Sequence, residues 1–168
     1  MLKRERIILK LNDEVRETLL DEVTGLGDEE LNKRPSSGGW SIAQVMEHLY
    51  LMERAVVYNI QHALENGSIK EVSSKPIELT VNRSRKVEAP EFVQPSESSM
   101  TLKDLQRKLQ TSHEALRGIY TTVDQERLVE KTAVHPVFGE MNLFQWIPFV
   151  GYHEQRHIDQ IKEIKETL

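Results

Sequence analysis

The sequence predicts an all-α protein, a four-helix bundle that forms a single domain over residues 1–168. Four long segments repeat their apolar residues at steps of three and four, the period of an amphipathic helix. No segment shows a convincing two-residue alternation that would favour a strand. Hydrophobic residues make up 38% of the 168-residue chain and charged residues 29%, so the chain is long and apolar enough to bury one core.

The first predicted helix runs from Leu2 to Val23. Its apolar stripe consists of Ile8, Leu11, Val15, Leu19 and Val23. The second helix begins at Ser41, where the tetrapeptide SIAQ has the pattern of a capping box: the Ser41 hydroxyl accepts the amide of Gln44, and the Gln44 side chain returns to Ser41. We expect this helix to stop in a left-handed turn at Asn66–Gly67.

The third predicted helix starts at a Thr101 cap and continues to about Val123, and the fourth starts near Asn142, where NLFQ repeats the capping pattern. Pro148 lies beyond the first turn of the fourth helix, and a proline there has no N–H and disrupts the preceding turn. The fourth helix therefore either begins later than Asn142 or bends just before the histidines at positions 153 and 157.

The connection between the second and third helices, residues 68–99, is polar and rich in Ser, Pro and Glu. It is too long for a simple turn in a compact domain. Such a connection can run the length of a helix, which would leave the second and third helices parallel rather than antiparallel.

Composition narrows the possible functions. The net charge is −5 and the sequence pI is about 5.7, which disfavours binding to nucleic acid. No apolar run approaches the span of a bilayer, and the charged start MLKRER does not resemble a signal peptide, so we expect no membrane partner and a cytoplasmic location. The chain has no cysteine, so any bound metal must be held by nitrogen and oxygen atoms.

Two histidines in the fourth helix, His153 and His157, lie four residues apart on its apolar stripe. That spacing places both imidazoles on one helix face, as in helical chelates of divalent ions. The segment HEQRH has the letters of the zinc-protease motif H-E-x-x-H, in which the glutamate follows the first histidine, but we do not predict a metalloprotease. The pair taken alone is more typical of packed or solvated histidines than of a metal site.

A third histidine, His48, changes this interpretation. It stands among the apolar residues near the start of the second helix and is expected to point inward. Three imidazoles in one bundle core each need a partner, and a metal ion satisfies all three at once while leaving positions for water or substrate. The sequence thus predicts one divalent ion per chain at His48, His153 and His157.

Other polar and aromatic residues are weaker candidates. We expect His62 to be solvated and His113 to be packed or partly exposed, and we identify no general base. Trp40 is interpreted as a hydrophobic staple at a helix start, with contact to substrate as the alternative. Candidates for lining the site are His135, in a loop before the fourth helix, and Gln44 and Gln160, each one turn from a predicted ligand.

Three motifs resemble one known family. These are WSIAQVMEHL at residues 40–49, HPVFGEMNLFQWI at 135–147 and HEQRHIDQI at 153–161. In this order they resemble the DinB-like superfamily of metal-binding four-helix proteins, which includes the bacillithiol S-transferases. The resemblance implies an up-down-down-up bundle, a zinc or nickel ion at the three histidines, and a homodimer.

The resemblance does not fix the reaction, because relatives include thiol S-transferases, a thiol-dependent isomerase and proposed hydrolases. The preferred interpretation is a thiol S-transferase of the bacillithiol type, in which the ion binds a low-molecular-weight thiol as the thiolate. The alternative is a hydrolase in which the same ion activates water. A third interpretation, from another class, is a non-catalytic dimeric binding module whose metal ion is structural.

Overall fold

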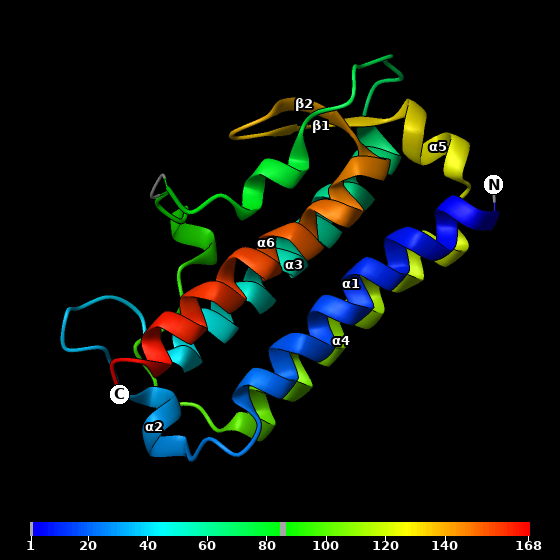
Figure 1. Cartoon of the computed structure of the whole chain (residues 1–168). Coiled ribbons are helices and arrows are strands. Elements are labelled where there is room, and N and C mark those ends of the chain that lie inside the picture. Colours follow the sequence, from blue (N-terminus) through cyan, green and yellow to red (C-terminus); the bar gives the residue numbers. More distant parts are fainter. Residues whose placement is uncertain (1, 85–86) are drawn as a thin grey trace.

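The computed structural model describes residues 2–84 and 87–168, with the side chains of residues 2–7 outside the description. Four long helices form the bundle, as predicted (Figure 1). They are α1 (Leu2–Val23), α3 (Ile42–Asn66), α4 (Leu102–Thr122) and α6 (Leu143–Lys165). The shorter helices are α2 (Asp28–Asn32), α5 (Gln125–Glu130) and the 3-10 helices η1 (Ile77–Val81) and η2 (Glu91–Val93). None of the helices described here is long and apolar enough to cross a membrane.

The helices follow the up-down-down-up topology that the sequence and its resemblance predict. In Figure 1, α1 and α6 run in one direction, whereas α3 and α4 both run in the other. The helix α1 packs beside α6, α3 packs beside α4, and α3 faces α6 across the core. The parallel arrangement of α3 and α4 requires a connection that returns along the whole molecule.

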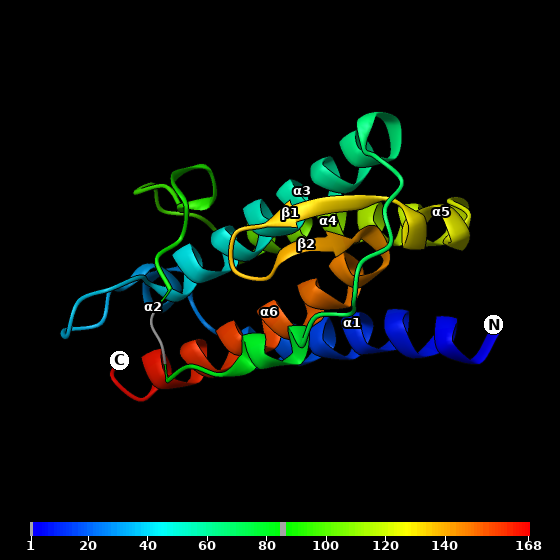
Figure 2. The same cartoon turned by 90° about the horizontal axis from the view of Figure 1, so that it is seen from above.

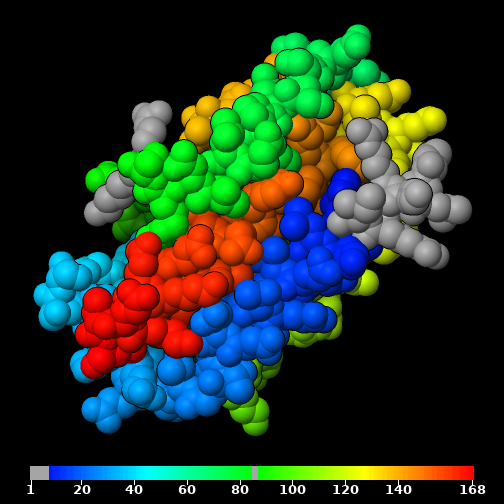
Figure 3. All heavy atoms as spheres, viewed as in Figure 1, coloured from blue at the N-terminus to red at the C-terminus, as the bar shows by residue number. Residues whose placement is uncertain are grey.

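That connection lies beside α6 on the surface of the bundle (Figure 3). The 3-10 helix η1 packs against α6. Two arginines help to fasten the segment: the Arg83 guanidinium donates to the carbonyl oxygen of Arg156, and the Arg156 guanidinium donates to the carbonyl oxygens of Thr80 and Asn82. The second 3-10 helix, η2, packs against α3 and delivers a backbone group to the histidine cluster described below.

The predicted helix caps differ in detail from one another. At the start of α3 the Ser41–Gln44 capping box is present in both directions, with N–O distances of 3.2 and 3.1 Å. At the start of α6 the Asn142 side chain accepts the amide of Gln145 at 3.0 Å. The Gln145 side chain does not return to Asn142, because it bonds the backbone of Lys75 in the long connection.

One expectation about a helix end is wrong, and one open alternative is decided. Gly67 ends α3 with φ −71° and ψ 150°, an extended conformation rather than a left-handed one. A glycine is required at this position because a Cβ there would lie only 2.5 Å from the carbonyl oxygen of Ala63. The helix α6 begins directly after Asn142, as its capping pattern predicts, so Pro148 lies inside the helix and the later start is excluded.

A small β-hairpin was not predicted. Strands β1 (Thr132–His135) and β2 (Gly139–Asn142) pair antiparallel just before α6 (Figure 2). Each strand has only four residues, which is too short to show a two-residue alternation in the sequence. The turn between them uses the positive φ of Gly139, 71°, which a glycine adopts without strain.

The buried core has two apolar halves. One half joins α1, α3, α4 and the C-terminal part of α6, and the other surrounds the hairpin and the N-terminal part of α6. Buried polar side chains lie between them at the middle of the bundle, namely Asn12, Arg16, His48, Glu53, Ser112, His113, Glu154 and His157. This polar layer contains the candidate site.

Candidate metal centre

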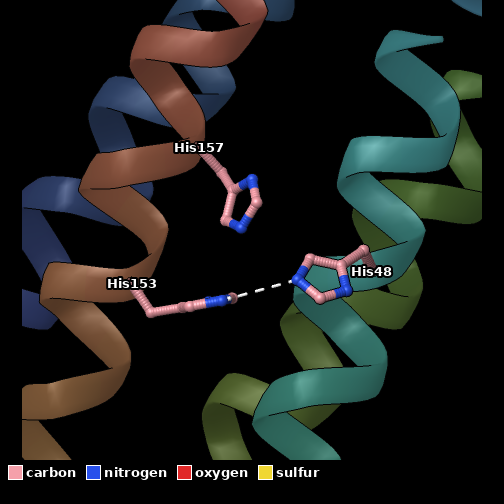
Figure 4. Close-up of side chains that lie close together, drawn as sticks. All are labelled: His48, His153 and His157. Atoms are coloured by element: carbon pink, nitrogen blue, oxygen red, sulfur yellow. Dashed lines mark hydrogen bonds between the residues drawn. The ribbon is translucent and has the colours of Figure 1, made fainter. Parts of the chain in front are cut away.

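The structure brings His48, His153 and His157 together. Figure 4 shows the three imidazoles converging between α3, which carries His48, and α6, which carries the other two. One ring nitrogen from each residue can be chosen so that all three lie within 4.8 Å of one another. The Nε2 atoms of His48 and His153 are 3.4 Å apart. The four-residue spacing on α6 therefore places two ligand candidates on the face that meets α3.

Hydrogen bonds fix the orientation of two of the rings. The His48 Nδ1 lies 2.8 Å from the carbonyl oxygen of Val93, and the His157 Nδ1 lies 2.8 Å from Oε1 of Gln160. Both partners are acceptors, so each Nδ1 carries the proton and each Nε2 keeps a lone pair. Metal-binding histidines are held in this way by an acceptor on the other ring nitrogen.

The Val93 carbonyl is held in place by the segment that follows it. The Glu47 carboxylate accepts the backbone N–H and the hydroxyl of Ser96 at 2.8 and 2.9 Å. The Gln44 side chain donates to the carbonyl oxygen of Ser96 at 3.1 Å. These contacts bind residues 93–96 to α3 beside His48.

Electrostatics keep the three imidazoles neutral. Burial lowers the pKa of His48, even though its bond to the Val93 carbonyl opposes the shift. Burial, together with the charge that His48 would carry, lowers the pKa of His157 to about 3. Burial and the neighbouring His157 and His48 hold the pKa of His153 well below its usual value. Neutral imidazole is the form that binds a metal ion.

The three-histidine cluster can therefore hold a metal ion. The described residues contribute three neutral nitrogens and no carboxylate or thiolate to it. Imidazole nitrogens suit zinc, nickel, copper and iron, and a three-nitrogen set leaves coordination positions for water or substrate. Glu154, next to His153 in the chain, does not complete the set, because both of its carboxylate oxygens accept from Arg16.

Aromatic rings flank the cluster. The Trp40 ring centroid lies 4.9 Å from that of His48, so the tryptophan packs on a candidate ligand. The Phe149 ring centroid lies 5.9 Å from that of His153 and 4.6 Å from that of His135. Aromatic rings thus cover one part of the surroundings of the imidazoles, within a layer that is otherwise polar.

The remaining candidates lie as follows. Gln160 contacts His157, whereas the amide of Gln44 is occupied by the capping box and by Ser96. His135 lies at the end of β1, not in a loop, and is buried next to Phe149. His62 is exposed, as expected.

His113 is packed rather than a ligand, and it belongs to a buried ion network that the sequence did not reveal. Its Nε2 lies 2.8 Å from Asp13 and its Nδ1 lies 3.3 Å from Glu53. The Arg16 guanidinium donates to Glu53 at 3.0 Å and to both oxygens of Glu154 at 2.8 and 2.9 Å. Arg16 could have indicated this network, because it directly follows Val15, a residue of the apolar stripe of α1.

The fold and the site together define a four-helix bundle with a three-histidine centre that can hold a metal ion. The sequence profile of the DinB superfamily matches residues 11–161. The chain belongs to the DinB superfamily.

Two proteins are similar to this chain along most of its length. The uncharacterized protein YuaE of Bacillus subtilis is 34% identical over 160 residues, which cover 95% of this chain and 98% of YuaE. A protein of Oceanobacillus iheyensis, OB0413, provisionally named a metal-dependent hydrolase, is 23% identical over 142 residues, which cover 84% of this chain and 74% of that protein.

Two solved structures share the fold. The four-helix bundle protein TT2238 superposes with a TM-score of 0.67 at 18% identity, covering 95% of this chain and 98% of TT2238. YfiT from Bacillus subtilis, described as a probable metal-dependent hydrolase with an unusual four-helix bundle topology, superposes with a TM-score of 0.67 at 16% identity, covering 99% of this chain and 88% of YfiT.

Proposed function

We propose that the protein is a metal-dependent hydrolase that acts on a small molecule, with one zinc or nickel ion held by His48, His153 and His157. The observation that carries the proposal is the convergence of three neutral imidazoles, two of which have their Nδ1 committed to fixed acceptors. A divalent ion bound there supplies a Lewis acid and lowers the pKa of coordinated water toward neutrality.

The relatives favour hydrolysis over thiol transfer. OB0413 and YfiT both carry descriptions as metal-dependent hydrolases. We therefore prefer the hydrolase, in which the ion activates water, to the thiol S-transferase that was the first interpretation of the sequence.

The protein's own residues have defined tasks in this proposal. The Val93 carbonyl and the Gln160 side chain hold the His48 and His157 rings so that their Nε2 lone pairs face the ion. The apolar rings of Trp40 and Phe149 restrict bulk water near the imidazoles, and a low local dielectric strengthens electrostatic interactions with a bound substrate.

The test is a substrate panel on protein reloaded with zinc or nickel. Aryl esters, anilides and phosphodiesters report hydrolysis, and a chromogenic electrophile with a small thiol reports transfer. Hydrolysis that His157→Ala abolishes and His62→Ala leaves intact would support the proposal. Conjugation of the thiol without hydrolysis would replace it with the transferase, and metal binding without either reaction would favour the non-catalytic module.

A further inference from the structure

His135 has one ring nitrogen that is fully used. Its Nδ1 accepts the backbone N–H groups of Val137 and Phe138 at 3.1 and 3.2 Å, which closes the turn of the hairpin. A nitrogen that accepts two N–H groups carries no proton, so the neutral ring has its proton on Nε2. Burial lowers the pKa of His135 to about 4, which keeps the ring in this neutral form near pH 7.

The other ring nitrogen has no partner. His135 is 4% exposed, and its Nε2 is buried without a hydrogen-bond partner among the described residues. A buried N–H without an acceptor has lost its hydration without compensation, which is unfavourable. Native proteins rarely retain such a group unless a ligand or water completes it.

A second buried donor lies beside it. Trp146 is 2% exposed, and its Nε1 also has no hydrogen-bond partner among the residues described. The ring centroids of His135 and Trp146 are 5.2 Å apart. An indole nitrogen can only donate, so neither ring can satisfy the other while His135 Nδ1 is occupied by the turn.

Both donors adjoin the metal centre. The Phe149 ring contacts His135, Trp146 and His153, at centroid distances of 4.6, 6.1 and 5.9 Å. Phe138 packs on the other side of His135, at 5.1 Å. Figure 2 shows the β1–β2 hairpin lying next to the first turns of α6. His135 is in this hairpin, Trp146 and Phe149 are in the first turns of α6, and His153 follows them on the same helix.

We propose that the Nε2–H of His135 and the Nε1–H of Trp146 form a subsite that binds a carbonyl oxygen of the substrate. The inference rests on the proposed function and narrows its substrate class to a carbonyl compound with a flat, apolar group. Two neutral donors among aromatic rings suit an uncharged acceptor, because no Lys or Arg side chain among the described residues bonds at these nitrogens to compensate for the desolvation of an anion. The rings of Phe138 and Phe149 accommodate the flat group by stacking or edge contacts.

One substitution of His135 can remove the Nε2–H while keeping the hydrogen bonds that close the turn. In His135→Asn the side-chain oxygen can still accept backbone N–H groups two and three residues on, as asparagine does in turns. Its shorter side chain does not bring an N–H to the position of Nε2. Trp146→Phe removes the indole N–H together with part of the ring's volume, and it keeps an aromatic ring in the core; the recorded Tm reports the packing loss. His62→Asn makes the same exchange at an exposed site and serves as the control.

The probe is benzohydroxamate, which combines an aromatic ring, a carbonyl oxygen and a metal-binding group. Its affinity for the cobalt-loaded protein is measured from the visible absorption of the ion, and metal content and Tm are recorded for every variant. We expect His135→Asn and Trp146→Phe each to weaken binding about tenfold, equivalent to one hydrogen bond. Metal content should stay at the wild-type level, and His62→Asn should bind as the wild type does.

The result that overturns the inference is wild-type affinity for the probe in both variants. A failure of wild-type protein to bind the probe, or a crystal structure of the complex with only an ordered water at the two nitrogens, would overturn it as well. Failure of the proposed function has a different signature: the probe still discriminates the variants, but no member of the substrate panel is hydrolysed.

Discussion

Removing Arg16 should destabilise the protein more than any loss of packing at that site explains. Arg16, Glu53 and Glu154 are all buried, with side-chain exposures of 6%, 1% and 4%. Replacing the arginine with methionine keeps most of its volume but leaves two carboxylates without their cation. Breaking a buried ion pair by removing one partner costs about 3–5 kcal/mol. For a domain of this size that corresponds to a fall in Tm of about 6–20 °C.

The pH dependence of this loss distinguishes charge from packing. Burial raises the pKa of Glu154 even with Arg16 beside it, so without the arginine this carboxyl will take up a proton more readily still. The free energy of unfolding that Arg16→Met loses should therefore be smaller at pH 5 than at pH 7.5. Urea denaturation at both pH values measures it.

A matched variant completes this test. Arg16→Met combined with Glu53→Gln and Glu154→Gln removes the unpaired charges, and it should recover part of the stability that the single variant loses. The reasoning would be refuted if Arg16→Met cost less than about 1 kcal/mol, or if its cost were the same at both pH values.

Three further predictions concern packing and protonation. Gly151→Ala should cost about 1–3 kcal/mol, because the new Cβ would lie 2.4 Å from the buried Asn12 Oδ1. Gly118→Ala should instead stabilise α4 by about 0.5–1 kcal/mol, because its Cβ would meet nothing within 4 Å outside the neighbouring backbone of its own helix. Chemical denaturation of both variants decides, and equal effects would contradict the packing argument. Burial alone would lower the pKa of His113, but Glu53 and Asp13 raise it, so its contribution to stability is present below about pH 6.5 and is lost as the pH rises through the raised value. The stability difference between wild type and His113→Gln should thus be larger at pH 6 than at pH 9, and the opposite trend would refute the assignment. The three clustered histidines have lowered pKa values, so the unfolded chain takes up protons below about pH 6.5 that the native site refuses, and Tm should fall with acid. Excess zinc should raise Tm at neutral pH and lose this effect by about pH 5, and coincident curves with and without zinc would show that no ion is coupled to the fold.

The helices could be predicted because each has a long periodic stripe and a local start signal. Ser41 and Gln44 specify the start of α3 within four residues, and the structure has the same capping box. The same pattern at Asn142 predicted the start of α6. It did not predict the contacts of Gln145, whose side chain bonds the backbone of Lys75, 70 residues away. The hairpin was missed because four-residue strands carry no period and depend on packing against α3 and α6.

The three histidines of the site were predicted by their apolar surroundings and their helical spacing. The groups that orient these rings were harder to predict from the sequence. Gln160 is on the same helix as His157, so its position could be inferred, but the partner of His48 is a backbone carbonyl of Val93, which has no residue-type signal. The paired donors of His135 and Trp146 depend on how the hairpin folds onto α6, which local sequence does not specify.

The measurement that tests the central claim most directly is the metal content of the purified protein and two histidine variants. Protein prepared without chelator, analysed by inductively coupled plasma mass spectrometry, should contain one divalent ion per chain. His157→Ala removes a nitrogen from the cluster and should lose tight binding, whereas His62→Ala changes an exposed histidine and should keep the ion. Equal metal content in the two variants would contradict the assignment of His48, His153 and His157 as a metal centre.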